Sequence, residues 1–99
     1  MSKILILAGG TRAESRNNIV ASYVEEYLKQ LDVPCSLFDE LYLNTPFLLD
    51  YEDTQPQSIV DIRDTLIDSD KLIIFSPVFN GGYVSHLKNT LDWLSLGCL

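Results

Sequence analysis

Basic residues are few in this 99-residue chain, with seven Lys and Arg against 14 Asp and Glu and a formal net charge of −7. Non-specific nucleic-acid binding needs a clustered basic patch, so this balance argues against a nucleic-acid partner. Long apolar runs are also missing, and the one that follows Lys3 extends only from Ile4 to Ala8. That run is too short for a signal peptide or a membrane-spanning helix, so we expect no membrane partner.

Cysteine is equally scarce, and the two cysteines, Cys35 and Cys98, form neither a CxxC pair nor a zinc-ligand pattern. This usage is typical of free thiols in a reducing compartment, and we expect a cytoplasmic protein. With 46% apolar and 21% charged residues, the composition is too apolar for a disordered chain. A chain of this length forms one domain at most, or part of one.

Apolar runs and amphipathic stretches alternate along the chain and predict an α/β fold with the order β-α-β-α-β-α. Continuous apolar runs predict three buried strands, at residues 3–8, 35–38 and 72–76. Helical spacing predicts helices over about 16–31 and about 84–94, and Pro56 suits the first turn of a helix between them. Turn-forming residues indicate a long loop over 40–55.

Apolar residues at helical spacing indicate the buried face of each helix. On the first helix, which Ser15 would cap, they are Ile19, Val20, Tyr23, Val24, Tyr27, Leu28 and Leu31. On the second helix they are Ile59, Ile62, Leu66 and Ile67, and on the last Val84, Leu87, Leu91 and Leu94. We also expect Trp93 and the tyrosines of the first helix to be core residues.

Two polar loops follow the first and third predicted strands. Crossovers through helices make such strands parallel, and ligands of these folds bind beyond the carboxyl ends of the strands. The first loop leads into a helix N-terminus, where free N–H groups and the helix dipole favour anions. Thr11, Arg12, Ser15 and Asn17 add hydroxyls, a guanidinium and an amide at this place. The loop is therefore predicted to hold a phosphate.

Several phosphate-binding loops do not match these residues. A Walker A loop requires a lysine that is missing here, and the later glycines of a dinucleotide fingerprint are replaced by Thr11 and Glu14. A receiver domain would need acidic residues where Ala8 and Ser76 stand, and a flavodoxin-like tyrosine phosphatase would need a cysteine in the first loop. The sugar nucleotidyltransferase loop AGGxGTR is two residues longer than the segment that begins at Ala8.

One family matches both loops. The segment GGTRAESRN, from Gly9 to Asn17, resembles the GSTRxxSxN phosphate loop of the NAD(P)H-dependent FMN reductase family. The segment PVFNGGYVSHLKNTLDW, from Pro77 to Trp93, resembles its second flavin motif, P-x-Y-N-G…LKN-x-LDW. The resemblance implies a flavodoxin-like, three-layer α/β/α fold with a parallel sheet of strand order 2-1-3 in this chain. It also implies FMN as cofactor and NAD(P)H as electron donor.

The resemblance also implies roles for individual residues. The FMN phosphate would be held by Thr11, Arg12, Ser15 and Asn17, together with backbone N–H groups near Arg16. The isoalloxazine ring would be bordered by Pro77, Val78, Phe79, Asn80 and Gly81. Two positions depart from the family pattern, because Gly10 replaces a common Ser and Phe79 replaces a common Tyr.

Flavodoxin-like sheets have five strands in the order 2-1-3-4-5, and this chain supplies three. We therefore interpret residues 1–99 as the N-terminal part of such a domain, with strands 4 and 5 missing or supplied by a partner chain. The third strand, Leu72 to Phe75, would then be an edge that favours pairing with another copy, so a homo-oligomer is expected.

The resemblance implies two-electron transfer from NAD(P)H through FMN to a small-molecule acceptor such as a quinone, an azo compound, a metal oxyanion or free flavin. No catalytic side chain and no metal are expected, because the flavin carries the chemistry. Two alternatives remain open at this point: a flavodoxin-type electron carrier that does not oxidise NAD(P)H, and an inactive truncated fragment.

Overall fold

Three parallel strands form the centre of the fold: β1 (Ile4–Ala8), β2 (Cys35–Phe38) and β3 (Lys71–Phe75). Their order is β2-β1-β3, with Ile4 opposite Cys35 on one side and opposite Lys71 on the other. The structure is a computed structural model that describes residues 3–10, 15–41, 56–76, 78–79, 82–83 and 85–95. The predicted sheet and its order are confirmed, with each strand within one residue of its expected position.

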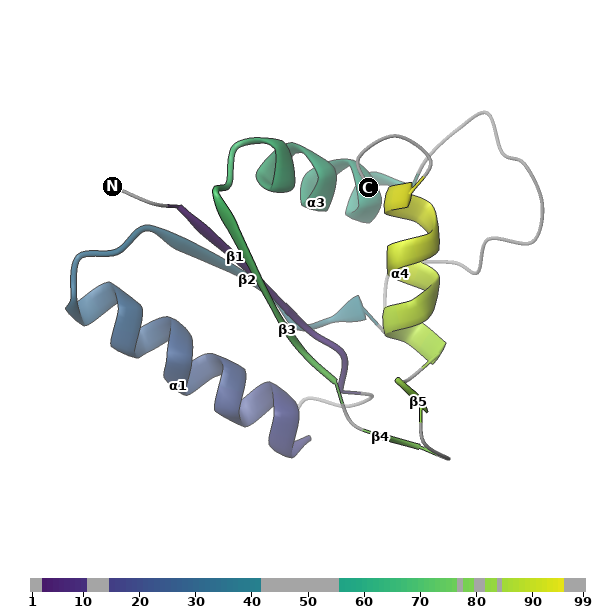
Figure 1. The fold of residues 1–99 in the computed structure, drawn as a ribbon, viewed down its shortest axis with the longest axis horizontal. Helices are drawn as coiled ribbons and strands as arrows, with labels where there is room; N and C mark the ends of the chain where they lie inside the picture. Colours follow the sequence, from purple (N-terminus) through teal and green to yellow (C-terminus); the bar gives the residue numbers. More distant parts are fainter. Residues whose placement is uncertain are drawn as a thin grey trace.

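Helices cover both faces of this sheet (Figure 1). Helix α1 (Arg16–Gln30) lies on one face, and α3 (Gln57–Ile67) and α4 (Ser85–Ser95) lie on the other. Successive side chains of a strand point to opposite faces, so β1 contributes to two cores. Ile6 and Ala8 pack against Ala21 of α1, and Leu5 and Leu7 pack on the opposite side. The expected three-layer α/β/α architecture is thus confirmed.

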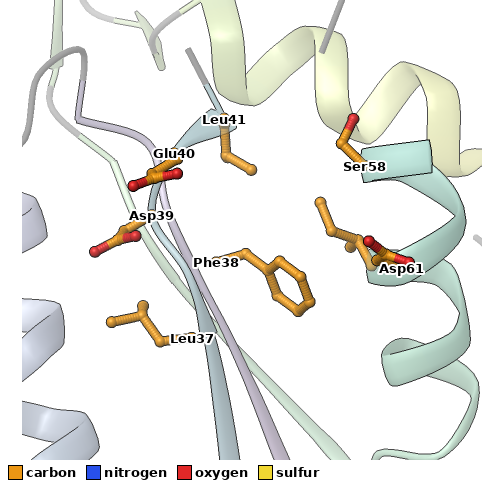
Figure 2. A pocket seen from close by; sticks show the side chains of 8 residues that line it. Leu37, Phe38, Asp39, Glu40, Leu41, Ser58 and Asp61 are labelled. Atoms are coloured by element: carbon orange, nitrogen blue, oxygen red, sulfur yellow. The ribbon is translucent and has the colours of Figure 1, made fainter. Parts of the chain in front are cut away.

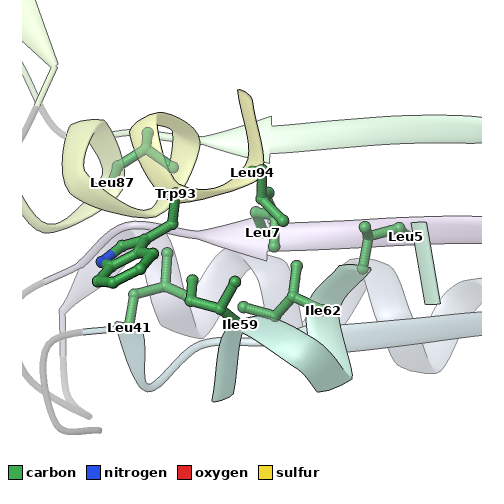
Figure 3. Close-up of a cluster of buried hydrophobic side chains, with 8 residues drawn as sticks. All are labelled: Leu5, Leu7, Leu41, Ile59, Ile62, Leu87, Trp93 and Leu94. Carbon is green, nitrogen blue, oxygen red and sulfur yellow. The ribbon is translucent and has the colours of Figure 1, made fainter. Parts of the chain in front are cut away.

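The larger core lies between β1 and the helices α3 and α4 (Figure 3). Its buried residues are Leu5, Leu7, Leu41, Ile59, Ile62, Leu87, Trp93 and Leu94. The predicted inward positions of α3 and α4 therefore hold for Ile59, Ile62, Leu87 and Leu94, and Trp93 is a core residue as expected. Arg63 joins the two helices, because its Nη2 donates to the carbonyl oxygen of Trp93 at 3.0 Å.

The predicted buried face of α1 is partly wrong. Tyr23 and Tyr27 are 68% and 62% exposed, and the predicted core residues Ile19, Val20 and Leu31 are exposed as well. The face that meets the sheet is formed by Asn18 and Ala21, with Val24 and Leu28 half-buried. Helical periodicity marks an apolar stripe, but only the part of it that contacts a sheet three strands wide becomes buried.

Ile67 is also wrongly predicted as buried, since 73% of it is exposed at the end of α3. Ile67 is the last residue of this helix. The described residues contain no helix of the length and apolarity required to cross a membrane.

The C-terminus of α1 is defined by a Schellman-type pattern of backbone hydrogen bonds. The N–H of Val33 donates to the Leu28 carbonyl at 2.9 Å, and the N–H of Asp32 donates to the Lys29 carbonyl at 3.1 Å. Asp32 occupies the left-handed region with φ of 58°. The helix predicted over about 16–31 therefore ends within one residue of its expected end, and the chain continues into β2.

Candidate functional site

The carboxyl ends of β1 and β3 lie side by side, which brings the two predicted loops to one edge of the sheet. Ala8 at the end of β1 is paired with Phe75 at the end of β3. Directly beyond this pair, the N–H of Gly9 donates to the carbonyl oxygen of Phe75 at 2.8 Å. Parallel pairing therefore places the start of the first loop next to the end of the third strand, as the sequence predicts.

The described part of the first loop consists of its two ends. Of the predicted phosphate ligands, Ser15, Arg16 and Asn17 belong to the described residues, whereas Thr11 and Arg12 lie outside them. Ser15 is the N-cap of α1 with extended backbone (φ −58°, ψ 138°), but its hydroxyl makes no capping hydrogen bond. The predicted cap is therefore correct in position, although its hydroxyl does not bond to the backbone of α1.

The first turn of α1 is suited to a negative ligand. It contains no acidic residue and begins with the exposed Arg16 and the half-buried Asn17. The first N–H groups of a helix have no partner within the helix, and the helix dipole places partial positive charge there. The Ser15 hydroxyl can donate a further hydrogen bond at the same place. These donors are of the kind that binds a phosphate group.

Asn18 is a functional candidate that the sequence motif does not indicate. It is 2% exposed, its Oδ1 accepts from the N–H of Gly10 at 3.0 Å, and its Nδ2 donates to the carbonyl oxygen of Asp39 at 3.0 Å. It therefore connects the end of β1 to the end of β2. One sequence signal exists: Asn18 stands at helical spacing from Ala21 and Val24, and it is a polar residue on an inward face.

The second predicted loop contains a short antiparallel pair that the sequence did not predict. Strands β4 (Val78–Phe79) and β5 (Gly82–Tyr83) pair Val78 with Tyr83 and Phe79 with Gly82. The intervening residues, Asn80 and Gly81, form the dipeptide most typical of two-residue hairpins. Among the predicted ring contacts, Val78 and Phe79 belong to β4, and Pro77, Asn80 and Gly81 lie outside the described residues.

A pocket with a cavity volume of about 220 Å³ opens beside the carboxyl end of β2 (Figure 2). Phe38 points into it, and Leu41, Ser58 and Ile62 contribute to its wall. Carboxylates of Asp39, Glu40 and Asp61 also line it. These negative charges repel a phosphate, so the pocket does not compete with the first loop as a phosphate site.

A family model described as NADPH-dependent FMN reductase matches residues 2–98. Among curated proteins, FMN-dependent NADPH-azoreductases of Staphylococcus aureus strains USA300 and NCTC 8325 are each 32% identical over 102 residues. That match covers 95% of this chain and 53% of each relative. The chain therefore spans about half the length of the relatives it matches.

A solved structure supports the same fold. The flavoenzyme FerB, an NAD(P)H:(acceptor) oxidoreductase from Paracoccus denitrificans, superposes with a TM-score of 0.74 at 20% sequence identity. The superposition covers 96% of this chain and 51% of FerB. At this identity, the likeness establishes the flavodoxin-like fold.

Proposed function

Because the chain belongs to the family of NADPH-dependent FMN reductases, we propose that residues 1–99 form the N-terminal part of an FMN-binding domain. The function proposed for the whole protein is NAD(P)H-dependent oxidoreduction with bound FMN, in the manner of flavin, quinone or azo reductases. The observation that carries this proposal is the meeting of the two motif loops at one sheet edge, with Gly9 bonded to Phe75.

The phosphate of FMN is assigned to the first loop. The guanidinium of Arg12, the hydroxyls of Thr11 and Ser15, the Asn17 amide and the N–H near Arg16 would supply its hydrogen bonds. Charge-assisted bonds of this kind are about twice as strong as neutral ones. The acid-free first turn of α1 and the hydroxyl of Ser15, which makes no capping bond, support this assignment.

The isoalloxazine ring is assigned to the segment that follows β3. Pro77, Val78 and Phe79 would supply an apolar border, and Asn80 and Gly81 would bring backbone groups close to the polar edge of the ring. Glycine permits such a close approach because it has no Cβ. Two backbone pairs, Val78 with Tyr83 and Phe79 with Gly82, hold the segment on either side of these residues.

Bound FMN would supply two-electron transfer between NAD(P)H and a small-molecule acceptor. The residues of this chain bind and orient the cofactor, and none is required as an acid or a base. We place the protein in the cytoplasm, consistent with the free thiol of Cys35, and we propose that it functions as a homo-oligomer.

Flavin titration tests the binding part of this proposal. Purified chain is titrated into FMN and, separately, into riboflavin, which lacks the phosphate, while flavin fluorescence is recorded. We expect FMN to bind more tightly than riboflavin, and equal affinities would contradict the phosphate assignment. The reductase part is tested by NAD(P)H oxidation in a domain completed by two further strand–helix units. FMN binding without NAD(P)H oxidation would favour the electron-carrier alternative.

A further inference from the structure

Three hydrogen bonds connect the carboxyl ends of β1, β2 and β3, and two of them are made by the side chain of Asn18. Gly9 donates its N–H to Phe75 at the end of β3, at 2.8 Å. Gly10 donates its N–H to Oδ1 of Asn18, and Nδ2 of Asn18 donates to the carbonyl of Asp39 beyond β2, each at 3.0 Å. The sheet edge beneath the first loop is therefore cross-linked from β3 through β1 to β2.

The carboxamide of Asn18 matches both of its backbone partners. It offers an acceptor to the N–H of Gly10 and a donor to the carbonyl of Asp39. An apolar side chain would remove both bonds, and a buried backbone group without a partner is costly. An aspartate would keep the acceptor but place a carboxylate oxygen against the Asp39 carbonyl. Within this pair of contacts, the neutral amide is the side chain that satisfies both groups.

Close packing also restricts which residue can occupy position 10. A Cβ on Gly10 would lie 2.4 Å from Oγ of Ser15 and 2.6 Å from Oδ1 of Asn18. Real Cβ atoms essentially never approach other atoms this closely, so residue 10 accepts only glycine without rearrangement. Gly10 and Ser15 flank residues 11–14 in the sequence. The two ends of the phosphate loop are thus packed against each other, and Asn18 holds one of them in place.

We propose that Asn18 is a positioning residue for phosphate binding, acting through the backbone of Gly10. By fixing Gly10 against α1 and β2, it would pre-organise the segment that carries Thr11 and Arg12. Pre-organised ligands bind more tightly because less ordering is required on binding. This proposal rests on the proposed role of the loop in holding the FMN phosphate. It requires a loss of affinity that is selective for the phosphate, because the ring is assigned to a different segment.

The test compares FMN with riboflavin in three variants of the full 99-residue chain. Asn18→Leu removes both hydrogen bonds and keeps the branching of the side chain at Cγ, and Gly10→Ala displaces Asn18 without changing it. Ile59→Val is the matched control, since it removes one buried methylene on the opposite face of the sheet. We expect Asn18→Leu and Gly10→Ala each to weaken FMN binding about tenfold while riboflavin binding changes less than about threefold.

The control variant should leave the ratio of FMN to riboflavin affinity unchanged. Equal losses for FMN and riboflavin in Asn18→Leu and Gly10→Ala would show a merely structural role and overturn the proposal. Unchanged FMN affinity in both would overturn it as well, without affecting the proposed function. If the wild-type 99-residue chain binds neither flavin, the same variants are compared in the domain completed by two further strand–helix units, and a completed wild-type domain that binds neither flavin would contradict the proposed function.

Amide exchange at Gly10 tests the positioning contact without any flavin. The Gly10 N–H should exchange at least about tenfold faster in Asn18→Leu than in wild type, relative to the amides of β1, when followed by NMR. The same Gly10 rate in both proteins would overturn the proposal, whatever the flavin titrations show.

Discussion

The side chains at the carboxyl edge of the sheet differ in charge from one place to another. The first loop combines a guanidinium, two hydroxyls and an acid-free helix start, whereas the neighbouring pocket beside β2 is lined by Asp39, Glu40 and Asp61. For this reason we propose the first loop, and not the pocket beside β2, as the phosphate site. Away from this edge, the ionisation of Cys35 also depends on its particular neighbours.

Replacement of Arg12 tests the charge of the loop most directly. Arg12→Glu should weaken FMN binding by about 2 kcal/mol or more in a complete domain, because one charge-assisted contact is lost and one repulsion is added. Flavin-fluorescence titration measures the change, with riboflavin as the phosphate-free control. Unchanged FMN affinity would contradict the assignment of the loop to phosphate.

Cys35 should react slowly with thiol reagents. Partial burial and the nearby Glu25 carboxylate raise the pKa of the Cys35 thiol above its ordinary value, so less reactive thiolate is present at a given pH. In a Cys98→Ser background, the alkylation rate plotted against pH should have its midpoint above that of free cysteine. Glu25→Gln should move the midpoint downward, and a midpoint at or below the free value would show that the environment does not suppress ionisation.

The ends of the helices and strands are set by local backbone chemistry. Helix α1 stops where Asp32 adopts a positive φ and two backbone bonds close its last turn. Past β3, an Asn-Gly pair stands between β4 and β5, which then leads towards α4. Asp32 and Asn80 are residue types with known backbone preferences, and each can be replaced without changing a residue of the two hydrophobic cores.

Asp32→Gly should stabilise the chain by about 0.5–1 kcal/mol. The left-handed conformation is strained for a residue with a Cβ and is not strained for glycine, which is the usual residue at this position of a Schellman motif. Urea denaturation of the two proteins measures the difference. Asp32→Ala is the control and should not stabilise, because alanine retains the Cβ.

At Asn80, between β4 and β5, loss of the side chain should matter less for flavin binding than loss of the backbone N–H and of backbone freedom. Asn80→Pro removes an N–H and restricts φ, so it should disturb flavin binding more than Asn80→Ala. The visible spectrum of bound FMN reports on the surroundings of the ring. Equal and small effects of both substitutions would count against this segment as the border of the ring.

At the scale of the whole molecule, the described central sheet has two edge strands, β2 and β3. They differ in how much of their apolar side chains is exposed. On β3, Leu72 and Ile74 are 36% and 41% exposed. Parallel strands are normally buried on both faces, so this apolar edge is unusual. Small domains have only about 5–15 kcal/mol of net stability, and an uncovered apolar edge reduces what is available.

We expect the 99-residue chain alone to self-associate and not to sustain NAD(P)H oxidation, even with FMN added. The exposed residues of β3 should drive the association, so Ile74→Lys should shift the chain towards monomer in size-exclusion chromatography. Ser36→Lys on β2 is the matched control and should change the elution volume much less. A monomeric wild-type chain with steady turnover would contradict both expectations.

Much of the fold could be derived from local patterns. The apolar runs at residues 3–8, 35–38 and 72–76 marked the strands, and crossovers through helices made them parallel. The resemblance to the FMN reductase family implied that the first strand lies in the middle. Parallel pairing in that order places the first loop beside the end of β3, which the contact between Gly9 and Phe75 bears out. These inferences succeed because strand period, helix period and turn chemistry belong to short segments of the chain.

The packing of helices against the sheet decided which side chains of α1 are buried and which residues Asn18 contacts. Periodicity could not tell that Tyr23 and Tyr27 of the apolar stripe remain exposed, because burial depends on which neighbouring elements cover a helix. Nor could a motif show that Asn18 links Gly10 to Asp39, since those residues meet only when α1 packs across β1 and β2. A local sequence pattern specifies which groups a segment offers, and packing determines which of them meet.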